Sequence, residues 1–484
     1  MWTYLDPDIY LYFMLRFTIL EKHSCVGGTW NINRYPGCAC DVPSNFYCFS
    51  FLQVTLTNSE ITTIPSQNPS WSRAFASHTE IRGYLETVAS RFGLYPHIKF
   101  GRTITRSKWD EVASKWTVET AGGETFTGDV VVSGSGLQHL PVYPSYPGME
   151  QFQGDAFHTS AWREGYSPVD KRIAVLGTGS SGVQVMPTLA EQGARSVTVF
   201  QRTPCMAPPK GDFVIPEWCK IVFALFPPIQ TLYRWRLFWF FEHVFWTTFT
   251  ISPKSLEINE AVRQYIKATV ADPEVAAKLT PSYNMGSKRP TPSDNYYQAF
   301  NKDSVHLNTT AISCFTEAGI RTVDGEEHEF DTIIYATGFD VVKSAKGWEQ
   351  EGLRGSIDQD YGAAPAAYLG ITHHNHPNFF RLYGPGTLNT SIIYMIECQV
   401  NYAMDAIEKM LKSGAKSMVV KPEVLRNYQD KRVKMNKGSA FADNTTASYY
   451  RSSAGVNWVV WPLLMCQYWW ATATANLEDF HMEY

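Results

Sequence analysis

The first 26 residues contain no glycine. The turn of a nucleotide-binding βα unit needs glycine, because that residue tolerates positive φ and lets the backbone approach a pyrophosphate. Residues 17–21 form an apolar run that ends in Glu21, like the second strand of such a unit with its ribose-binding carboxylate. We therefore expect the first βα unit to be missing from this chain. A misassigned start of the chain and an unrelated replacement strand are the alternatives.

Other absences exclude whole classes of protein. The nine cysteines are scattered without paired CxxC spacing, which argues against a zinc or disulfide framework. A net charge of -4 leaves no electrostatic footprint for nucleic acid. Asp6 and Asp8 precede the N-terminal apolar run where a secretory signal would carry basic residues. A reduced, cytoplasmic protein is expected.

A glycine-rich turn between two apolar runs predicts a dinucleotide-binding unit. Residues 171–176 have the pattern of a buried parallel strand, residues 183–192 that of a helix, and residues 196–200 that of a second strand. The helix N-terminus would bind phosphates with its free N–H groups, and a glycine-rich surface turn is the less favoured alternative. The candidate cofactor contacts of this unit are Gly177, Thr178, Gly179, Ser180, Ser181, Gly182, Val183 and Gln184.

The second strand of this unit lacks the acidic residue that would accept a hydrogen bond from a ribose 2′-hydroxyl. Gln201, Arg202 and Thr203 follow it instead. An arginine at this place suits a 2′-phosphate. We therefore predict NADPH rather than NADH, with Arg202 and Thr203 at the phosphate.

A second glycine motif occupies residues 27–41. Gly27 and Gly28 allow the backbone to approach a bound cofactor closely, and Trp30 and Tyr35 offer flat apolar surfaces. Asp41 follows a Pro-Gly turn, so its short carboxylate is placed by the backbone. From the local sequence alone, Asp41 is a functional carboxylate or a turn-capping aspartate.

Two motifs in the right order resemble the type I Baeyer–Villiger monooxygenases, and the whole looks closest to fungal FAD-dependent members that act in secondary metabolism. Residues 27–41 resemble one family signature, small-Gly-x-Trp-x4-aromatic-Pro-Gly-x3-Asp. Residues 152–162 resemble the family fingerprint, Phe-x-Gly-x3-His-x3-Trp, with Arg163 where Pro or Asp is usual. The resemblance implies FAD, NADPH, O2 and a ketone substrate. Its implied flavin-site residues are Glu21, Gly28, Thr29, Trp30, Asn31, Ile32, Asn33, Ala39, Cys40, Asp41 and Tyr47.

Two adjacent cations, Lys288 and Arg289, precede Pro290. On local sequence they fit a solvated turn equally well. The resemblance implies that Arg289 lies over the flavin and stabilises the C4a-peroxyflavin anion, that Asp41 orients this arginine, and that Lys288 holds the NADP phosphate. The catalytic candidates are therefore Arg289 and Asp41.

His158 of the fingerprint has two interpretations. It is a catalytic acid or base, or an ordering residue in the linker between the domains. We favour the ordering role, because one histidine alone is no catalytic constellation.

Residues 218–253 are strongly aromatic and interrupt the NADP unit. Arg234, Arg236 and Glu242 break the apolar run, so it falls short of the ~20 residues of a membrane-spanning helix. Three interpretations remain: a helical subdomain with an aromatic core, a wall of a substrate cavity, or a membrane-surface helix. The aromatic core is the default, and membrane-surface contact is not favoured.

The predicted fold is α/β with two Rossmann-like domains and a helical insertion. The expected parts are an FAD domain at 1–140 and 331–484, a linker at 141–165, an NADP domain at 166–212 and 286–330, and an insertion at 213–285. The predicted function is NADPH- and O2-dependent oxidation of a ketone to an ester or lactone, with a polyketide mycotoxin precursor as the expected kind of substrate. The alternatives are a heteroatom- or N-hydroxylating flavin monooxygenase and an inactive product without the FAD glycine loop.

Overall fold

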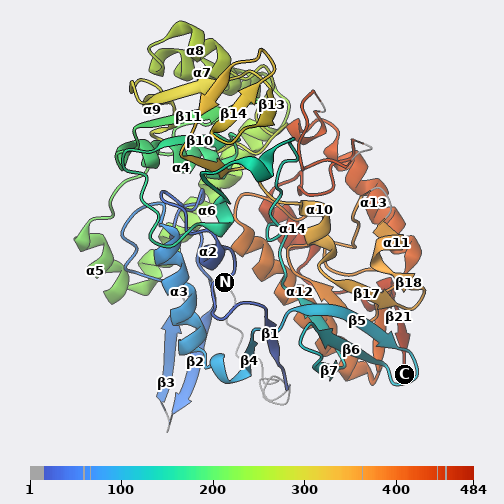
Figure 1. The fold of residues 1–484 in the computed structure, drawn as a ribbon. Helices are drawn as coiled ribbons and strands as arrows, with labels where there is room; N and C mark the ends of the chain where they lie inside the picture. The colour runs from blue at the N-terminus through green and yellow to red at the C-terminus, as the bar shows by residue number, and fades with distance from the viewer. Residues whose placement is uncertain (1–15, 58–59, 66, 362–363, 444, 453–454) are drawn as a thin grey trace.

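A computed structural model provides the structure of the protein for residues 16–484, except 58–59, 66, 362–363, 444 and 453–454 (Figure 1). The expected loss of the first βα unit concerns residues 1–15 and lies outside the described residues.

The NADP-binding part is built on a five-stranded parallel sheet with the order β12-β11-β10-β16-β9. Each residue of β10 after Arg172 is buried, as in a parallel strand covered on both faces. Helix α4 (Ser180–Glu191) follows β10 and packs Val183, Met186 and Leu189 into the core below the sheet. The strands are β9 (Asp155–His158), β10 (Arg172–Leu176), β11 (Ser196–Phe200), β12 (Val305–Asn308) and β16 (Thr332–Tyr335).

Two expected domain borders cut through this sheet. Strand β9 carries part of the 152–162 fingerprint and pairs with β16, so the fingerprint belongs to the sheet rather than to a free linker. Strand β16 lies beyond the expected border at 331 and pairs with both β10 and β9. The expected domain borders at 166 and 331 are therefore wrong. Local sequence does not reveal that β16 pairs with β10 and β9. A three-stranded antiparallel sheet adjoins this part: β13 (Ile312–Phe315), β14 (Gly319–Thr322) and β15 (Glu327–Glu329).

The FAD-binding part is assembled from both ends of the chain. Strand β1 (Ile19–Glu21) pairs in parallel with β4 (Ile98–Phe100), and β8 (Val131–Ser133) pairs in parallel with β19 (Phe379–Arg381). A five-stranded sheet has the order β18-β17-β5-β6-β7, and the pairs β2-β3 and β20-β21 are antiparallel. These strands are β2 (Leu52–Thr57), β3 (Glu60–Pro65), β5 (Ile104–Asp110), β6 (Lys115–Thr120), β7 (Thr125–Gly128), β17 (Glu349–Gly352), β18 (Gly355–Ser356), β20 (Ser417–Val420) and β21 (Phe480–Glu483).

The helices of the FAD-binding part surround these sheets, and the long helix α12 is central among them (Figure 1). One face of α12 is buried in the largest hydrophobic core, through Met395, Tyr402 and Met410. The helices are α2 (Thr29–Ile32), α3 (His78–Arg91), α10 (Val341–Lys346), α11 (Ile357–Tyr361), α12 (Ile392–Ser413), α13 (Pro422–Asn436) and α14 (Met465–Ala471).

The expected helical insertion lies between β11 and β12. It consists of α5 (Glu217–Leu225), α6 (Pro227–Phe249), α7 (Pro253–Thr269) and α8 (Pro273–Leu279), followed by the short α9 (Tyr296–Ala299). The aromatic-core interpretation holds only in part. Phe238 and Phe245 are buried, whereas Trp239 and Trp246 keep 59% and 55% of their surface exposed.

The starts of helices α3 and α4 show how local sequence sets the end of an element. Ser77 caps α3 by accepting a hydrogen bond from the backbone N–H of Glu80. The Glu80 carboxylate does not complete a capping box, because it accepts from the N–H and hydroxyl groups of Ser72 instead. Helix α4 begins at Ser180 rather than at 183, because its start is set by the extended backbone of Gly179 and not by apolar periodicity.

Candidate functional site

Asp41 and Arg289 lie 248 positions apart in the chain and meet in the fold. Arg289 Nη2 donates to Asp41 Oδ2 over 3.1 Å. The Asp41 side chain is 12% exposed and that of Arg289 is 35% exposed, so one partner is nearly buried and the other keeps an open side. Burial lowers the pKa of Arg289, but Tyr449 and Asp41 outweigh it and hold this pKa well above its usual value. Arg289 is therefore a permanent cation with a fixed orientation.

Gln184 joins this pair to the NADP-binding part. It stands on the first turn of α4, and its Nε2 donates to the carbonyl of Ala39 over 2.9 Å and to Asp41 Oδ1 over 3.4 Å. Its Oε1 accepts from the Tyr35 hydroxyl over 2.9 Å. Gly37 (φ +81°) has no room for a side chain, because a Cβ there would lie 2.6 Å from the Gln184 carbonyl. The segment that carries Asp41 is thus docked directly on α4.

Lys210 is a second cation beside Asp41, and the sequence gave no local signal for it. Its Nζ lies 4.0 Å from Asp41 Oδ1, and its side chain is only 10% exposed. The same ammonium group lies 4.8 Å from the centre of the Phe75 ring. Lys210 follows two prolines in a loop, where no periodicity marks a functional residue.

The glycine turn after β10 fits a dinucleotide pyrophosphate. A Cβ on Gly182 would lie 2.2 Å from the Gly177 carbonyl, and one on Gly177 (φ +113°) would lie 2.5 Å from the Ala336 carbonyl. Gly179 caps α4 without a side chain, and nothing lies within 4 Å of its Cβ position. The N–H groups of Ser180 and Ser181 are therefore open to a phosphate at the helix N-terminus. Val183 continues the turn as a buried anchor.

Three cations converge where a 2′-phosphate is expected. Burial lowers the pKa of Lys288, and the nearby charges of Arg202 and Arg451 lower it further. Thr178 Oγ1 donates to the Thr203 carbonyl over 2.9 Å, which holds the glycine turn against the segment after β11. Arg451 Nη2 donates to the Thr446 carbonyl, whereas its buried Nη1 has no hydrogen-bond partner among the described residues. Repelling cations with an unsatisfied donor form a fitting site for an anion.

The candidate flavin-site residues are brought together around α2. Glu21 ends β1, and one of its carboxylate oxygens accepts the N–H of His23 over 2.8 Å. Gly28 (φ +50°) precedes α2 in open space. Trp30 and Tyr47 pack edge to face with ring centres 5.6 Å apart. The remaining candidates of this group follow from the same segment: Thr29, Asn31 and Ile32 lie in α2, Asn33 ends it, and Ala39 and Cys40 directly precede Asp41.

Three tyrosines lie near Arg289. Tyr449, Tyr450 and Tyr383 all influence its pKa, and Tyr449 Oη is buried without a hydrogen-bond partner. Tyr383 has a positive φ of 56°, which a bulky residue rarely adopts. None of these three tyrosines is among the candidate site residues named from the sequence.

His158 orders the crossing between the two parts. It is fully buried, and burial lowers its pKa to about 4. Nε2 donates to the Gly338 carbonyl over 3.1 Å, and Nδ1 accepts from the Ser160 backbone N–H over 3.1 Å. With both ring nitrogens occupied within the protein, a neutral positioning residue fits this geometry better than a catalytic base.

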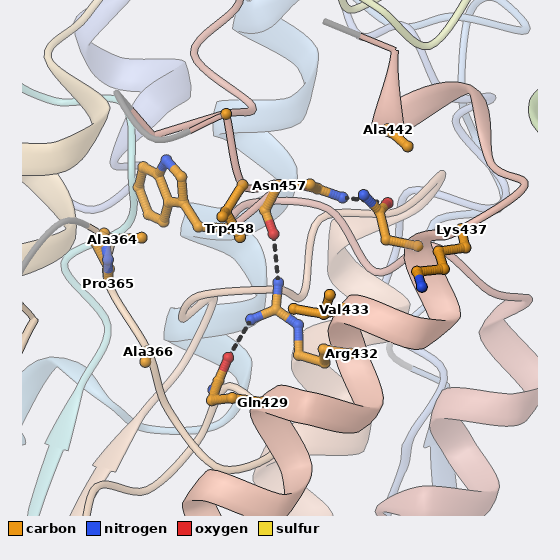
Figure 2. Close-up of a pocket in the computed structure, with 13 residues that line it drawn as sticks. Ala364, Pro365, Ala366, Gln429, Arg432, Val433, Lys437, Ala442, Asn457 and Trp458 are labelled. Carbon is orange, nitrogen blue, oxygen red and sulfur yellow. Dashed lines mark hydrogen bonds between the residues drawn. The ribbon is translucent and has the colours of Figure 1, made fainter.

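Figure 2 shows a cavity of about 270 Å³ that Arg432 helps to line. The buried Arg432 donates to Gln429 Oε1 over 3.3 Å and to the Asn457 carbonyl over 3.1 Å. Its guanidinium packs on Gly386 (φ +76°), where a Cβ would lie 2.5 Å from Arg432 Cζ. Arg432 therefore holds the loop that leads into the N-terminus of α12.

A second cluster of titratable groups lies outside the candidate site. Ligand-type atoms of Asp360, His373 and His376 lie within 4.8 Å of one another. Burial and the charge of Arg381 lower the pKa of His376 to about 3, and the same positive charge opposes a bound metal cation. Trp116 stacks on His376 with ring planes 4° apart. Both ring nitrogens of His376 and Nδ1 of His373 are buried without a hydrogen-bond partner in the part of the chain that the structure describes.

Comparison with known sequences places the chain in one family. A profile of the flavin-binding monooxygenase-like family matches residues 15–343. The chain is 34% identical to a Baeyer–Villiger monooxygenase of Streptomyces coelicolor, over 96% of this chain and 88% of the relative. It is 35% identical to a Baeyer–Villiger monooxygenase of Pseudomonas aeruginosa, over 96% and 86%. It is 32% identical to the FAD-binding monooxygenase ktnD of Aspergillus niger, over 96% and 77%.

Solved structures of related monooxygenases have the same fold as this chain. Cyclohexanone monooxygenase from Rhodococcus sp. Phi1 bound to NADP+ superimposes with a TM-score of 0.84 at 27% identity, covering 96% of this chain and 94% of that one. A steroid monooxygenase bound to NADP superimposes with a TM-score of 0.81 at 27% identity, covering 98% and 96%. By sequence and by fold, this chain belongs to the type I Baeyer–Villiger branch of the flavin-binding monooxygenases and is an FAD- and NADPH-dependent monooxygenase.

Proposed function

We propose that the protein oxidises a bulky, apolar ketone to an ester or lactone, with Asp41 and Arg289 at the reacting centre. The overall reaction consumes the ketone, O2, NADPH and a proton, and yields the ester, NADP+ and water. The observation that carries the proposal is the Asp41–Arg289 pair, which is held against α4 by Gln184. Bound FAD supplies the redox chemistry, as hydride acceptor and as the source of electrons for O2.

The residues have separate roles in this proposal. Arg289 presents a permanent charge and planar donors where negative charge develops on the transferred oxygen. Asp41 fixes its orientation, and Lys210 offsets part of the Asp41 charge. On the NADPH side, the N–H groups of Ser180 and Ser181 bind the pyrophosphate, and Arg202 with Lys288 binds the 2′-phosphate.

The proposed flavin contacts come from residues 21–47. Glu21 binds the ribose, and Gly28 with α2 lies along the cofactor. Trp30 and Tyr47 form an apolar corner, because their rings pack edge to face. Tyr47 keeps its proton because burial raises its pKa. Burial also raises the pKa of the Cys40 thiol to about 12, which leaves it protonated and unreactive.

An aromatic cluster, here called the aromatic wall, packs beside Arg289. Its members Phe245, Phe441 and Tyr450 are buried, and these apolar surroundings favour an apolar substrate. Phe245 and Phe249 of α6 pack on Phe441, with ring centres 5.8 and 5.1 Å away. Phe441 packs in turn on Tyr450, which neighbours Arg289. Together with the similarity to a fungal FAD-binding monooxygenase, this wall favours an aromatic ketone of secondary metabolism, such as a polyketide.

The test is oxidation of matched substrates by the flavin-loaded enzyme under ¹⁸O2. A visible flavin spectrum after purification comes first, because a colourless chain would support the inactive-product hypothesis. Label from ¹⁸O2 in an ester of a polycyclic aromatic ketone, in preference to cyclohexanone, is the expected result. Oxidation restricted to an amine or a sulfide would instead favour the heteroatom monooxygenase.

A further inference from the structure

The helical insertion exposes an unusual amount of apolar surface. Thirteen of the 31 exposed large apolar side chains in the described part of the chain fall within residues 213–256. Figure 1 shows α5 standing out from the side of the molecule, joined to α6. We call this surface the insertion patch: Phe213, Val214, Trp218, Ile221, Leu225, Phe226, Ile229, Leu232, Trp239, Phe240, Trp246, Ile251 and Leu256.

Helix α6 has apolar residues on all sides, and only one side is covered. Its buried side includes Phe238 and Phe245. On the opposite side Leu232, Trp239 and Trp246 recur every seven residues, which places them in one stripe two turns apart. A stripe of this kind in contact with water marks a surface that binds an apolar partner.

Charge identifies the partner. Residues 217–254 carry Lys220, Arg234, Arg236 and Lys254 against Glu217 and Glu242, a net of +2 in a chain of net -4. Glu242 is buried, whereas Arg236 is exposed within the stripe and has no carboxylate partner among the described residues. Lys220 is paired with Glu217, Lys254 with Glu257, and the buried Arg234 with Glu397. Within the described residues, Arg236 is therefore the cation of the patch that faces solvent unpaired. Tryptophan beside such a cation is typical of a segment that lies at an anionic lipid surface.

The other occupants fit less well. A two-fold contact of this stripe with a second copy would bring the Arg236 side chains together without an acidic partner. None of the helices in the described ranges combines the length and apolar character needed to cross a bilayer. The geometry therefore points to a surface contact.

We propose that the insertion patch rests on an anionic lipid bilayer. The buried side of the same helix leads toward the candidate site: Phe238 packs on Phe46 and on Tyr394, with ring centres 6.2 and 5.0 Å away. Helix α6 thus links the lipid contact to the aromatic wall beside Arg289. If the proposed ketone oxidation holds, the substrate is a lipid-soluble ketone taken up from the bilayer.

Flotation of the flavin-loaded full chain on a sucrose gradient tests the contact independently of activity. Vesicles of phosphatidylcholine with 30% phosphatidylserine should carry the protein upward, and pure phosphatidylcholine vesicles should carry about fivefold less, since each exposed cation adds attraction to anionic lipid. No flotation with either vesicle would overturn the proposal, as would equal flotation with both.

Variants locate the surface. Trp239→Glu combined with Trp246→Glu should reduce flotation about tenfold, and Arg236→Glu should remove the preference for phosphatidylserine. Trp470→Glu is the matched control, because Trp470 is 73% exposed on α14 outside the patch. An unchanged flavin spectrum would show that each variant is folded.

Lipid binding would be refuted if the double variant still floated with the vesicles. It would also be refuted if the wild type formed a dimer that the double variant disrupts, and neither kind of vesicle carried the protein upward. Loss of ketone oxidation with flotation intact would contradict only the proposed function.

Discussion

Gln184, on the first turn of the helix after the NADP glycine turn, donates to Asp41 Oδ1 over 3.4 Å. One amide thus joins helix α4 to the carboxylate that contacts Arg289. The same amide binds Ala39 and Tyr35, so its orientation is fixed from three directions.

Replacing Gln184 with alanine should uncouple the two halves of the reaction. Asp41 loses a donor, and the segment around Gly37 loses its tie to α4, so Arg289 is held less accurately. We expect ester formed per NADPH consumed to fall by about tenfold, since small misplacements at a reacting centre are costly. Parallel assays of NADPH oxidation and ester yield measure this ratio. Gln192→Ala, at the exposed end of the same helix, should behave as wild type; equal coupling in the Gln184 variant would disprove the link.

Replacing Arg289 with alanine should leave flavin reduction by NADPH within a fewfold of wild type. Ester formation should fall by about 10²–10³-fold, because the charge that stabilises developing negative charge is gone. Stopped-flow absorbance follows the reduction, and mass spectrometry follows the ester. Arg289→Lys should recover only part of the activity, since lysine lacks the planar donors. Arg321→Ala, on a surface strand, is the control and should behave as wild type. If Arg289→Ala still formed the ester at the wild-type rate, Arg289 would not have the assigned role.

Replacing Lys288 or Arg202 with alanine should weaken the binding of NADPH more than the binding of NADH. Each contributes a charge-assisted hydrogen bond to the expected 2′-phosphate, worth about 1.5–3 kcal/mol, so KM for NADPH should rise roughly 10- to 100-fold. KM for NADH, which has no 2′-phosphate, should change little. Steady-state kinetics with both nucleotides measure the selectivity. A parallel loss with NADH would show that these cations do not read the 2′-phosphate.

His158 should make stability depend on pH. Its folded pKa of about 4 lies below the usual value of 6.5, so the folded state favours the neutral ring. This contribution is complete above pH 6.5 and declines as the pH falls toward 4, because the unfolded chain then binds the extra proton. Between pH 7 and pH 5 the loss amounts to about 2 kcal/mol. Thermal unfolding midpoints of wild type and His158→Gln over this range test it: the variant should show a shallower decline, and an identical decline would contradict the assignment.

The sequence predicts the NADP side of the candidate site better than the side around Asp41 and Arg289. The turn at 177–182 and its strands were predicted from spacing, because parallel βα units repeat a local pattern of apolar runs and glycine. The roles of Asp41 and Arg289 are implied by the family resemblance. On local sequence Arg289 fits a solvated turn equally well, and turn capping is the alternative for Asp41. Lys210, Tyr383 and Arg432 carry no local pattern, since their positions depend on contacts between distant segments.

The aromatic insertion marks the limit of sequence reasoning most clearly. Composition alone showed a helix rich in tryptophan and phenylalanine, but the side that faces water depends on what packs against it. The sequence by itself determined the βα unit of the NADP site, because its strands, glycine turn and helix follow from short-range periodicity. Only the tertiary structure decided that Asp41 meets Arg289 and that Trp239 and Trp246 face outward. Such pairings arise from the packing of segments up to 248 residues apart, which no local pattern encodes.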